Sequence, residues 1–285
     1  MLDQRRIQAG LARTLKGRIA HDDELGIRYA AGPAGEIVLR LPYAPFLADR
    51  DGERTVGPGG LVTLLDSVCG VGAMAALGFE EAVATLDLRI DYLRPPRPES
   101  DVCATARMLA VNGSPGRGSV AMRGEALQDG HNQPIAIATG LFIRRPLRHE
   151  PRPFEELPPA ALATAETYDA LMGFSPDGQG RIRMPFRPGL VGNGSLPSLH
   201  GGAIAAHLQE AARAAIGQAV RTRFALTTAH FAFLRFGGPA ELLATPEIDR
   251  LGATAAFVRV ASFQQDHHRP TATGSFTFMR AFGRL

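Results

Sequence analysis

Hydrophobic and polar positions along the chain follow two different patterns, and each pattern predicts a different element. Residues 86–92 alternate strictly between apolar and charged side chains, which predicts a strand with one buried and one wet face. Residues 60–77 and 202–216 are instead apolar segments of helical length. Further strand-like runs follow the alternating strand, at residues 102–111, 119–128 and 135–144. One mostly buried helix followed by long antiparallel strands predicts an α+β unit in which the sheet wraps around the helix.

Blocks of the sequence recur in the same order with an offset of 143 residues. The segment 41–47 reappears at 184–190, and Gly59 falls on Gly202. A later block, Tyr92-Leu93-Arg94, matches residues 233–235 after a two-residue shift. Several ordered matches of this kind predict a tandem duplication.

A proline-rich segment separates the two copies. Residues 144–159 contain five prolines and mixed charges, which predicts an extended linker. We therefore expect a first domain at residues 1–150, with a helix before its repeat, and a second domain at residues 151–285.

The composition is that of an ordinary globular protein, and it narrows the possible partners. Of 285 residues, 45% are hydrophobic and 21% are charged, and Asp66 interrupts the most apolar stretch, so we expect no membrane helix. The first 18 residues lack the apolar segment of a secretory signal. The whole chain has two cysteines, Cys69 and Cys103, both in apolar contexts, and we expect them to be reduced core residues of a cytoplasmic protein. The net charge is +3, and Lys16 is the only lysine, a bias typical of a GC-rich bacterial genome. Arginine suits phosphate, but without tryptophan or a basic arm we expect a phosphate-bearing small molecule rather than nucleic acid.

A turn rich in small residues leads directly into the second helical segment. It ends in His200-Gly201-Gly202, with Asn193 seven residues before the histidine. Free N–H groups at a helix start attract an anion or an oxyanion, and glycine lets a substrate carbonyl approach the backbone closely. The turn is therefore a candidate site, although a turn that merely begins the helix would explain the same residues.

Asp66 stands in the middle of the first helical segment, among residues that must face a core. A carboxylate there is costly unless it is hydrogen-bonded or lines a cavity. We expect a general base or a nucleophile in a partly dry pocket. The alternative is a position at the edge of the apolar stripe.

Together, His-Gly-Gly, an apolar helix, a carboxylate nine residues after the histidine and a strand ending in Tyr-Leu-Arg-Pro resemble the PaaI-like hotdog thioesterases. In this chain the motif is split between the repeats. The second repeat has Gln209 nine residues after His200, whereas the first repeat has Asp66 but carries Gly57 nine residues before it. The resemblance covers both repeats and implies a double hotdog that pairs as a dimer within one chain.

In the family, each active site takes its His-Gly turn from one unit and its carboxylate and hydroxyl from the other. The resemblance therefore implies one complete site, made of Asn193, His200, Gly201, Asp66 and Thr85. The other site would be incomplete, because it would face Gly57 and Pro58 toward Gln209 and Leu226.

The activity that the resemblance implies is hydrolysis of an acyl-CoA thioester, with coenzyme A as part of the substrate. We expect no separate cofactor, and the spacing of histidines and cysteines contains no metal-binding motif. The N–H of Gly201 would hold the developing oxyanion, and His200 and Asn193 would shape its site. Asp66 would activate water or attack the carbonyl itself, and Thr85 would orient the water or the carboxylate. Further contacts to the substrate are expected from Gly202, Arg94, Arg97 and Arg144.

Several alternatives stay open. Glu210 stands beside Gln209 and could supply a second carboxylate, although one residue rotates a side chain by about 100° around a helix. The chain could also bind acyl-CoA without turnover, but Asp66 and Thr85 would then be unnecessary. A hotdog hydratase or dehydratase is disfavoured, since Asn193 is not followed by proline. We also expect two chains to associate as a dimer of double hotdogs, with neither a membrane nor a nucleic-acid partner.

Overall fold

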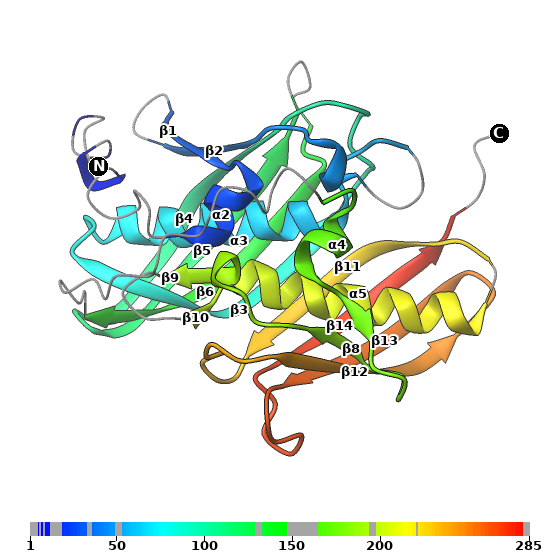
Figure 1. The fold of residues 1–285 in the computed structure, drawn as a ribbon. Coiled ribbons are helices and arrows are strands. Elements are labelled where there is room, and N and C mark those ends of the chain that lie inside the picture. The colour runs from blue at the N-terminus through cyan, green and yellow to red at the C-terminus, as the bar shows by residue number, and fades with distance from the viewer. Residues whose placement is uncertain are drawn as a thin grey trace.

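Two copies of one helix-and-sheet unit make up the molecule, for which we describe a computed structural model (Figure 1). The structure describes residues 5, 7, 9–11, 19–32, 36–48, 53–128, 133–146, 165–193, 198–220 and 222–281. The expected domain boundary near residue 150 lies outside these residues.

The elements of the two copies follow each other in closely similar order. The first copy consists of α2 (Ala20–Leu25), β1 (Arg28–Ala31), β2 (Ile37–Leu41), η2 (Pro45–Leu47), α3 (Pro58–Ala76), β3 (Glu81–Tyr92), β4 (Val102–Ser114), β5 (Arg117–Leu127) and β6 (Ala136–Pro146). The second consists of α4 (Tyr168–Met172), β7 (Ser175–Pro176), β8 (Ile182–Met184), η4 (Pro188–Leu190), β9 (Val191–Asn193), β10 (Ser198–Leu199), α5 (Gly201–Ala219), β11 (Phe224–Phe233), β12 (Leu242–Leu251), β13 (Ala255–Phe263) and β14 (Ala272–Arg280). The predicted helices and long strands of the first repeat are present within a few residues of their expected bounds.

Most strands of both copies join in one antiparallel sheet, whereas β9 and β10 pair with each other as a separate two-stranded sheet. Within the described residues the larger sheet has 12 strands in the order β1-β2-β4-β5-β6-β3-β11-β14-β13-β12-β8-β7. Reading outward from the centre, the two halves have matching strands, which is the symmetry expected of a duplication. The halves meet where β3 pairs with β11, with Asp91 opposite Thr228 and Asp87 opposite Ala232.

The helices α3 and α5 lie against this sheet, in cyan and yellow in Figure 1, and pack on each other. Their crossing is so close that a Cβ atom on Gly202 would lie 2.6 Å from the Cα atom of Thr63. Only glycine fits at this position. The contact brings the start of α5 against the middle of α3, and so joins the second repeat to the first at Asp66.

The helix α3 contains Asp66 and is still long and apolar enough to cross a membrane by length and composition, so Asp66 alone does not exclude a membrane helix. In the structure, 72% of its most apolar window is buried inside the protein. Such burial is what the central helix of a helix-on-sheet repeat requires.

The short helices α2 and α4 occupy equivalent positions in the two repeats, and the sequence pattern does not give their bounds. Both α2 and α4 end at a glycine in the left-handed conformation, Gly26 and Gly173. Asp22 and Asp169 lie four residues before these glycines. The helix α2 packs on η4 and β9 of the second repeat, and α4 packs on η2 of the first. Each short helix therefore covers the turn that precedes the long helix of the other repeat.

Candidate active site

Asp66 and Gly201 meet where the middle of α3 contacts the start of α5. A Cβ atom on Gly201 would lie 2.6 Å from Asp66 Oδ2, so only glycine leaves room for the carboxylate there. The Asp66 residue is 5% exposed. A buried carboxylate at the positive end of a helix dipole is stabilised by the free N–H groups of the first turn. The structure thus brings together the two halves of the split motif.

Thr85 reaches the same carboxylate because β3 is irregular. Its hydroxyl donates a hydrogen bond of 2.9 Å to Asp66 Oδ1. Strict alternation through the buried Leu88 and Ile90 would turn Thr85 outward, but the register with β6 shifts between Thr85 and Asp87. A bulge of this kind reverses the side-chain phase and turns Thr85 inward. The second repeat has the corresponding shift after Leu226, which supports the pairing of Thr85 with Leu226.

Burial raises the pKa of the Asp66 carboxyl above its usual range. His200, the hydroxyl of Thr85 and the backbone N–H of Gly202 act in the opposite direction without cancelling the effect of burial. The carboxylate is therefore more basic than an exposed aspartate. This is the property that a general base or a carboxylate nucleophile needs near neutral pH.

His200 forms the N-cap of α5 and is 5% exposed. The backbone N–H of Gly202 donates a hydrogen bond of 2.9 Å to His200 Nδ1. The same nitrogen lies 3.6 Å from Asp66 Oδ2, which is too far for a hydrogen bond. The imidazole thus orders the first turn of α5, and with it the N–H groups that face Asp66.

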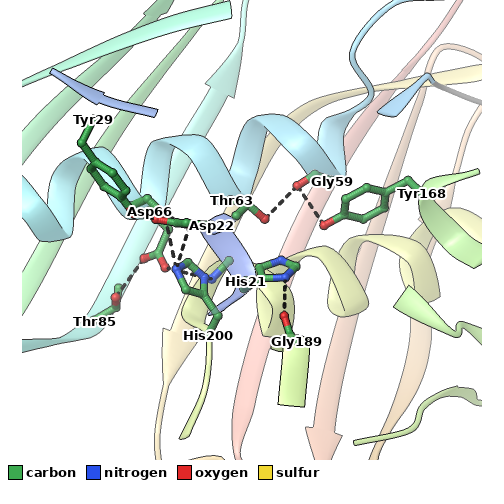
Figure 2. A network of polar contacts seen from close by, with 12 residues as sticks. His21, Asp22, Tyr29, Gly59, Thr63, Asp66, Thr85, Tyr168, Gly189 and His200 are labelled. Carbon is green, nitrogen blue, oxygen red and sulfur yellow. Dashed lines mark hydrogen bonds and ion pairs between the residues drawn. The ribbon is translucent and has the colours of Figure 1, made fainter. Parts of the chain in front are cut away.

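Residues that the sequence pattern does not single out lie near His200 Nε2, and Figure 2 labels Asp22 and Tyr29 among them. Ser67 Oγ lies 3.2 Å from His200 Nε2, and Asp22 Oδ1 lies 3.5 Å from it. Tyr29 donates a hydrogen bond to Asp22, and the His21 and His200 ring centroids are 5.3 Å apart. Burial raises the pKa of Asp22, although His200 and the two hydroxyl donors oppose that effect. A comparison of residues 21–27 with 168–174, which share an aspartate and a glycine, could have located this helix in the sequence.

The pseudo-dimer has a second position equivalent to the Asp66 site, formed by α5 and the start of α3, and its residues are different. Gln209 replaces Asp66, and its Nε2 donates a hydrogen bond of 2.5 Å to the hydroxyl of Tyr92. The ring of Tyr168 lies directly over Gly59 at the start of α3, and its hydroxyl donates a hydrogen bond of 3.2 Å to the Gly59 carbonyl (Figure 2). No space remains there for a residue larger than glycine. An aromatic ring therefore covers the helix start that would correspond to the His200 turn.

Comparison with known proteins identifies the family to which the chain belongs. Two family models match in tandem, described as "Thioesterase superfamily" over residues 58–126 and "Acyl-CoA thioesterase N-terminal domain" over residues 193–279. A protein of Halobacterium salinarum, named for an inferred esterase activity, is 33% identical over 122 residues, or 41% of this chain and 80% of that protein. The chain belongs to the thioesterase superfamily. It is a thioester hydrolase built from two hotdog repeats.

Solved structures of thioesterases share the fold. A protein of Thermobifida fusca, described as an inferred thioesterase II, has a TM-score of 0.62 at 13% identity, covering 93% of this chain and 98% of that one. An acyl-ACP thioesterase of Bacteroides thetaiotaomicron has a TM-score of 0.52 at 12% identity, covering 90% and 99%. At such low identity these likenesses concern the fold alone, and they confirm the predicted double hotdog.

Glu210, the alternative source of a second carboxylate in this thioesterase, is paired with an arginine of its own helix. Its Oε2 accepts a hydrogen bond of 3.1 Å from Arg213 Nε, three residues further along α5. Gln209, not Glu210, stands at the position equivalent to Asp66.

The other residues expected at the site either lie away from Asp66 or have side chains that the structure does not describe. The backbone of Asn193 pairs with Ser198 in β9 and β10, but its side chain lies outside the described part of the structure. Arg94 donates hydrogen bonds to the carbonyl of Pro134, and the backbone N–H of Arg97 donates to Gln128. Both arginines follow Tyr92, at the opposite end of β3 from Thr85. The structure therefore does not bring them together with Asp66.

Arg144 is unsuited to the expected contact with coenzyme A phosphates. Its Nη2 forms an ion pair of 2.5 Å with Glu81 Oε1, and its side chain is only 7% exposed. Its guanidinium also donates to the carbonyl of Asn112. The strand register explains the pairing, because Val83 lies opposite Arg144 and so places Glu81 diagonally across from it. Arg144 is thus a structural residue of the first repeat.

Among the described residues, no group of three or more histidine, cysteine, aspartate or glutamate side chains is arranged to hold a metal ion.

Proposed function

We propose that this thioesterase hydrolyses acyl-CoA at one composite site. The site combines Asp66 and Thr85 of the first repeat with the turn His200-Gly201-Gly202 of the second. The observation that carries the proposal is the contact of the buried Asp66 carboxylate with the start of α5. Acyl-CoA as the substrate class is supported by the family description that matches the second repeat, and by a basic, arginine-rich chain.

The start of α5 would stabilise the negative charge that develops on the substrate. With the acyl group bound, the N–H of Gly201 would donate to the thioester carbonyl oxygen and stabilise the negative charge that develops on it. His200 holds this turn through the hydrogen bond from Gly202. We extend this role to Asn193, whose backbone belongs to the segment that precedes the same turn.

Asp66 would supply the second role in its ionised form. As a general base it would take a proton from water while the water oxygen forms a bond to the carbonyl carbon. As a nucleophile it would form that bond itself, and water would then cleave the resulting anhydride. In either case the carbon–sulfur bond breaks, the thiolate of coenzyme A leaves and takes up a proton, and the acid is released. The Thr85 hydroxyl would hold the carboxylate in place.

The test measures release of free coenzyme A thiol from short-chain, medium-chain, long-chain and aromatic acyl-CoA substrates. Asp66→Asn keeps the size of the side chain and removes its basicity, and we expect turnover of the best substrate to fall at least about 100-fold. Gln209→Asn is the matched control, because it shortens the equivalent side chain on the opposite face of the pseudo-dimer. We expect this control, and Glu210→Gln, to retain activity.

Each outcome has a defined meaning. Turnover that survives Asp66→Asn but is lost in Glu210→Gln would move the chemistry to the other side of the pseudo-dimer. Turnover lost only in Asp66→Asn supports a single site. Binding of an acyl-CoA without any release of thiol would make this chain a ligand-binding module, and would overturn the proposal.

A further inference from the structure

A continuous set of hydrogen bonds leads from the first repeat to His200 of the second. Ser67 donates a hydrogen bond of 2.7 Å to Asp22 Oδ1, and Tyr29 donates to the other oxygen of the same carboxylate. Ser67 Oγ lies 3.2 Å from His200 Nε2. Asp22 has no exposed surface, and Ser67 is 4% exposed. The set is therefore shielded from water, where hydrogen bonds have a strong effect on orientation.

The direction of each hydrogen bond in this set follows from chemistry. Burial and the neighbouring Asp22 raise the pKa of the Tyr29 hydroxyl far above its usual value, so Tyr29 keeps its proton and donates it. Ser67 gives its only proton to Asp22, and its lone pair is left facing His200 Nε2. On the other side of the ring, the N–H of Gly202 can only donate, so His200 Nδ1 must accept. Both constraints place the imidazole proton on Nε2.

We propose that Asp22, acting through Ser67, is a positioning residue that holds the imidazole of His200 with its proton on Nε2. Nδ1 then remains free to accept from Gly202, and the first turn of α5 is held with Gly201 facing Asp66. Neither Asp22 nor Ser67 touches the reacting atoms in this scheme. The catalytic consequence rests on the proposed function, whereas the hydrogen bonding does not depend on it.

A loss of this support acts on the transition state more than on substrate binding. The carbonyl oxygen gains its negative charge only as the tetrahedral intermediate forms. A misplaced Gly201 N–H therefore weakens stabilisation of the transition state more than binding of the substrate. A small displacement of a catalytic group costs up to about 100-fold in rate. We therefore expect kcat to fall about 10- to 100-fold in Asp22→Asn and in Ser67→Ala, with little change in KM.

The direct readout is the imidazole of His200 in protein labelled with ¹⁵N-histidine, its signals assigned by their absence in His200→Gln. In the wild type we expect a proton on Nε2, slow to exchange with water, and none on Nδ1. In Asp22→Asn and Ser67→Ala that proton should exchange faster and its signal should move. A merely structural loss of stability in a protein that remains folded would not produce this change.

The second repeat offers a matched control. Asp169 occupies the position in α4 that Asp22 occupies in α2, and it lies 3.8 Å from Arg213 on the side of the incomplete site. Asp169→Asn should leave both the His200 signals and kcat unchanged. Ser67→Ala provides a second test should Asp22→Asn fail to fold.

The outcomes separate this inference from the proposed function. Unchanged His200 signals in both variants would overturn the role of Asp22, whether or not acyl-CoA is hydrolysed. An active wild type with unchanged kcat in both variants would overturn the catalytic consequence. An inactive wild type would refute the proposed function, and the spectra would still decide whether Asp22 holds His200.

Discussion

The hydroxyl of Thr85 gives the sharpest test of how the basicity of Asp66 is set. It donates a hydrogen bond of 2.9 Å to Asp66 Oδ1. This bond favours the ionised carboxylate and so lowers the Asp66 pKa, against the larger opposite effect of burial. Thr85→Val keeps the shape of the side chain and removes the donor. The Asp66 pKa must then rise further.

The size of the change follows from the energy of one hydrogen bond to a charged group. Such a bond contributes about 1.5–3 kcal/mol, and one pKa unit corresponds to about 1.4 kcal/mol. If only the ionised carboxylate is active, kcat/KM rises with pH as Asp66 loses its proton. We expect the acid limb of this profile to move to higher pH by about one to two units in Thr85→Val.

The assay is kcat/KM for the best acyl-CoA substrate, measured from acid to alkaline pH in the wild type and in Thr85→Val. Leu226→Val changes the equivalent bulge position of the second repeat, which faces no carboxylate of the composite site, and its profile should match the wild type. An acid limb that stays in place in Thr85→Val, or moves to lower pH, would show that Thr85 does not stabilise the ionised form of Asp66.

Two further predictions concern stability. Burial raises the Asp66 pKa in the folded protein, so the folded state binds its proton more tightly than the unfolded state, and stability falls as pH rises between the two pKa values. Asp66→Asn removes this penalty, so its thermal midpoint should gain on the wild type more at about pH 8 than at about pH 4, the ordinary pKa of an aspartate, and a constant difference would contradict the argument. Arg144→Met leaves the Glu81 carboxylate without its cation, so we expect a lower thermal midpoint but an unchanged KM for acyl-CoA. A raised KM at unchanged stability would instead return Arg144 to the substrate site.

The residues around Asp66 show which features can be predicted from local sequence patterns and which depend on tertiary contacts. The long helices, the strands and the duplication are predictable from the sequence, because periodicity and repeated blocks are properties of neighbouring positions. The placement of Asp66 against Gly201 could be anticipated only through the resemblance to a family whose units pair. The inward direction of Thr85 could not be read from alternation, because a single bulged residue in β3 reverses the phase.

What the tertiary structure alone decided is which distant side chains meet. Asp22 reaches His200 because a short helix of the first repeat packs on the turn of the second, a separation in sequence that no local pattern records. Arg144 is paired with Glu81 because the register of two strands places them diagonally. By itself, the sequence determined two copies of one helix-and-sheet unit and an unsymmetrical distribution of chemical groups between them. The packing of the copies decided which of those groups share a buried site, since burial and hydrogen bonding depend on contacts that form only when the chain is folded.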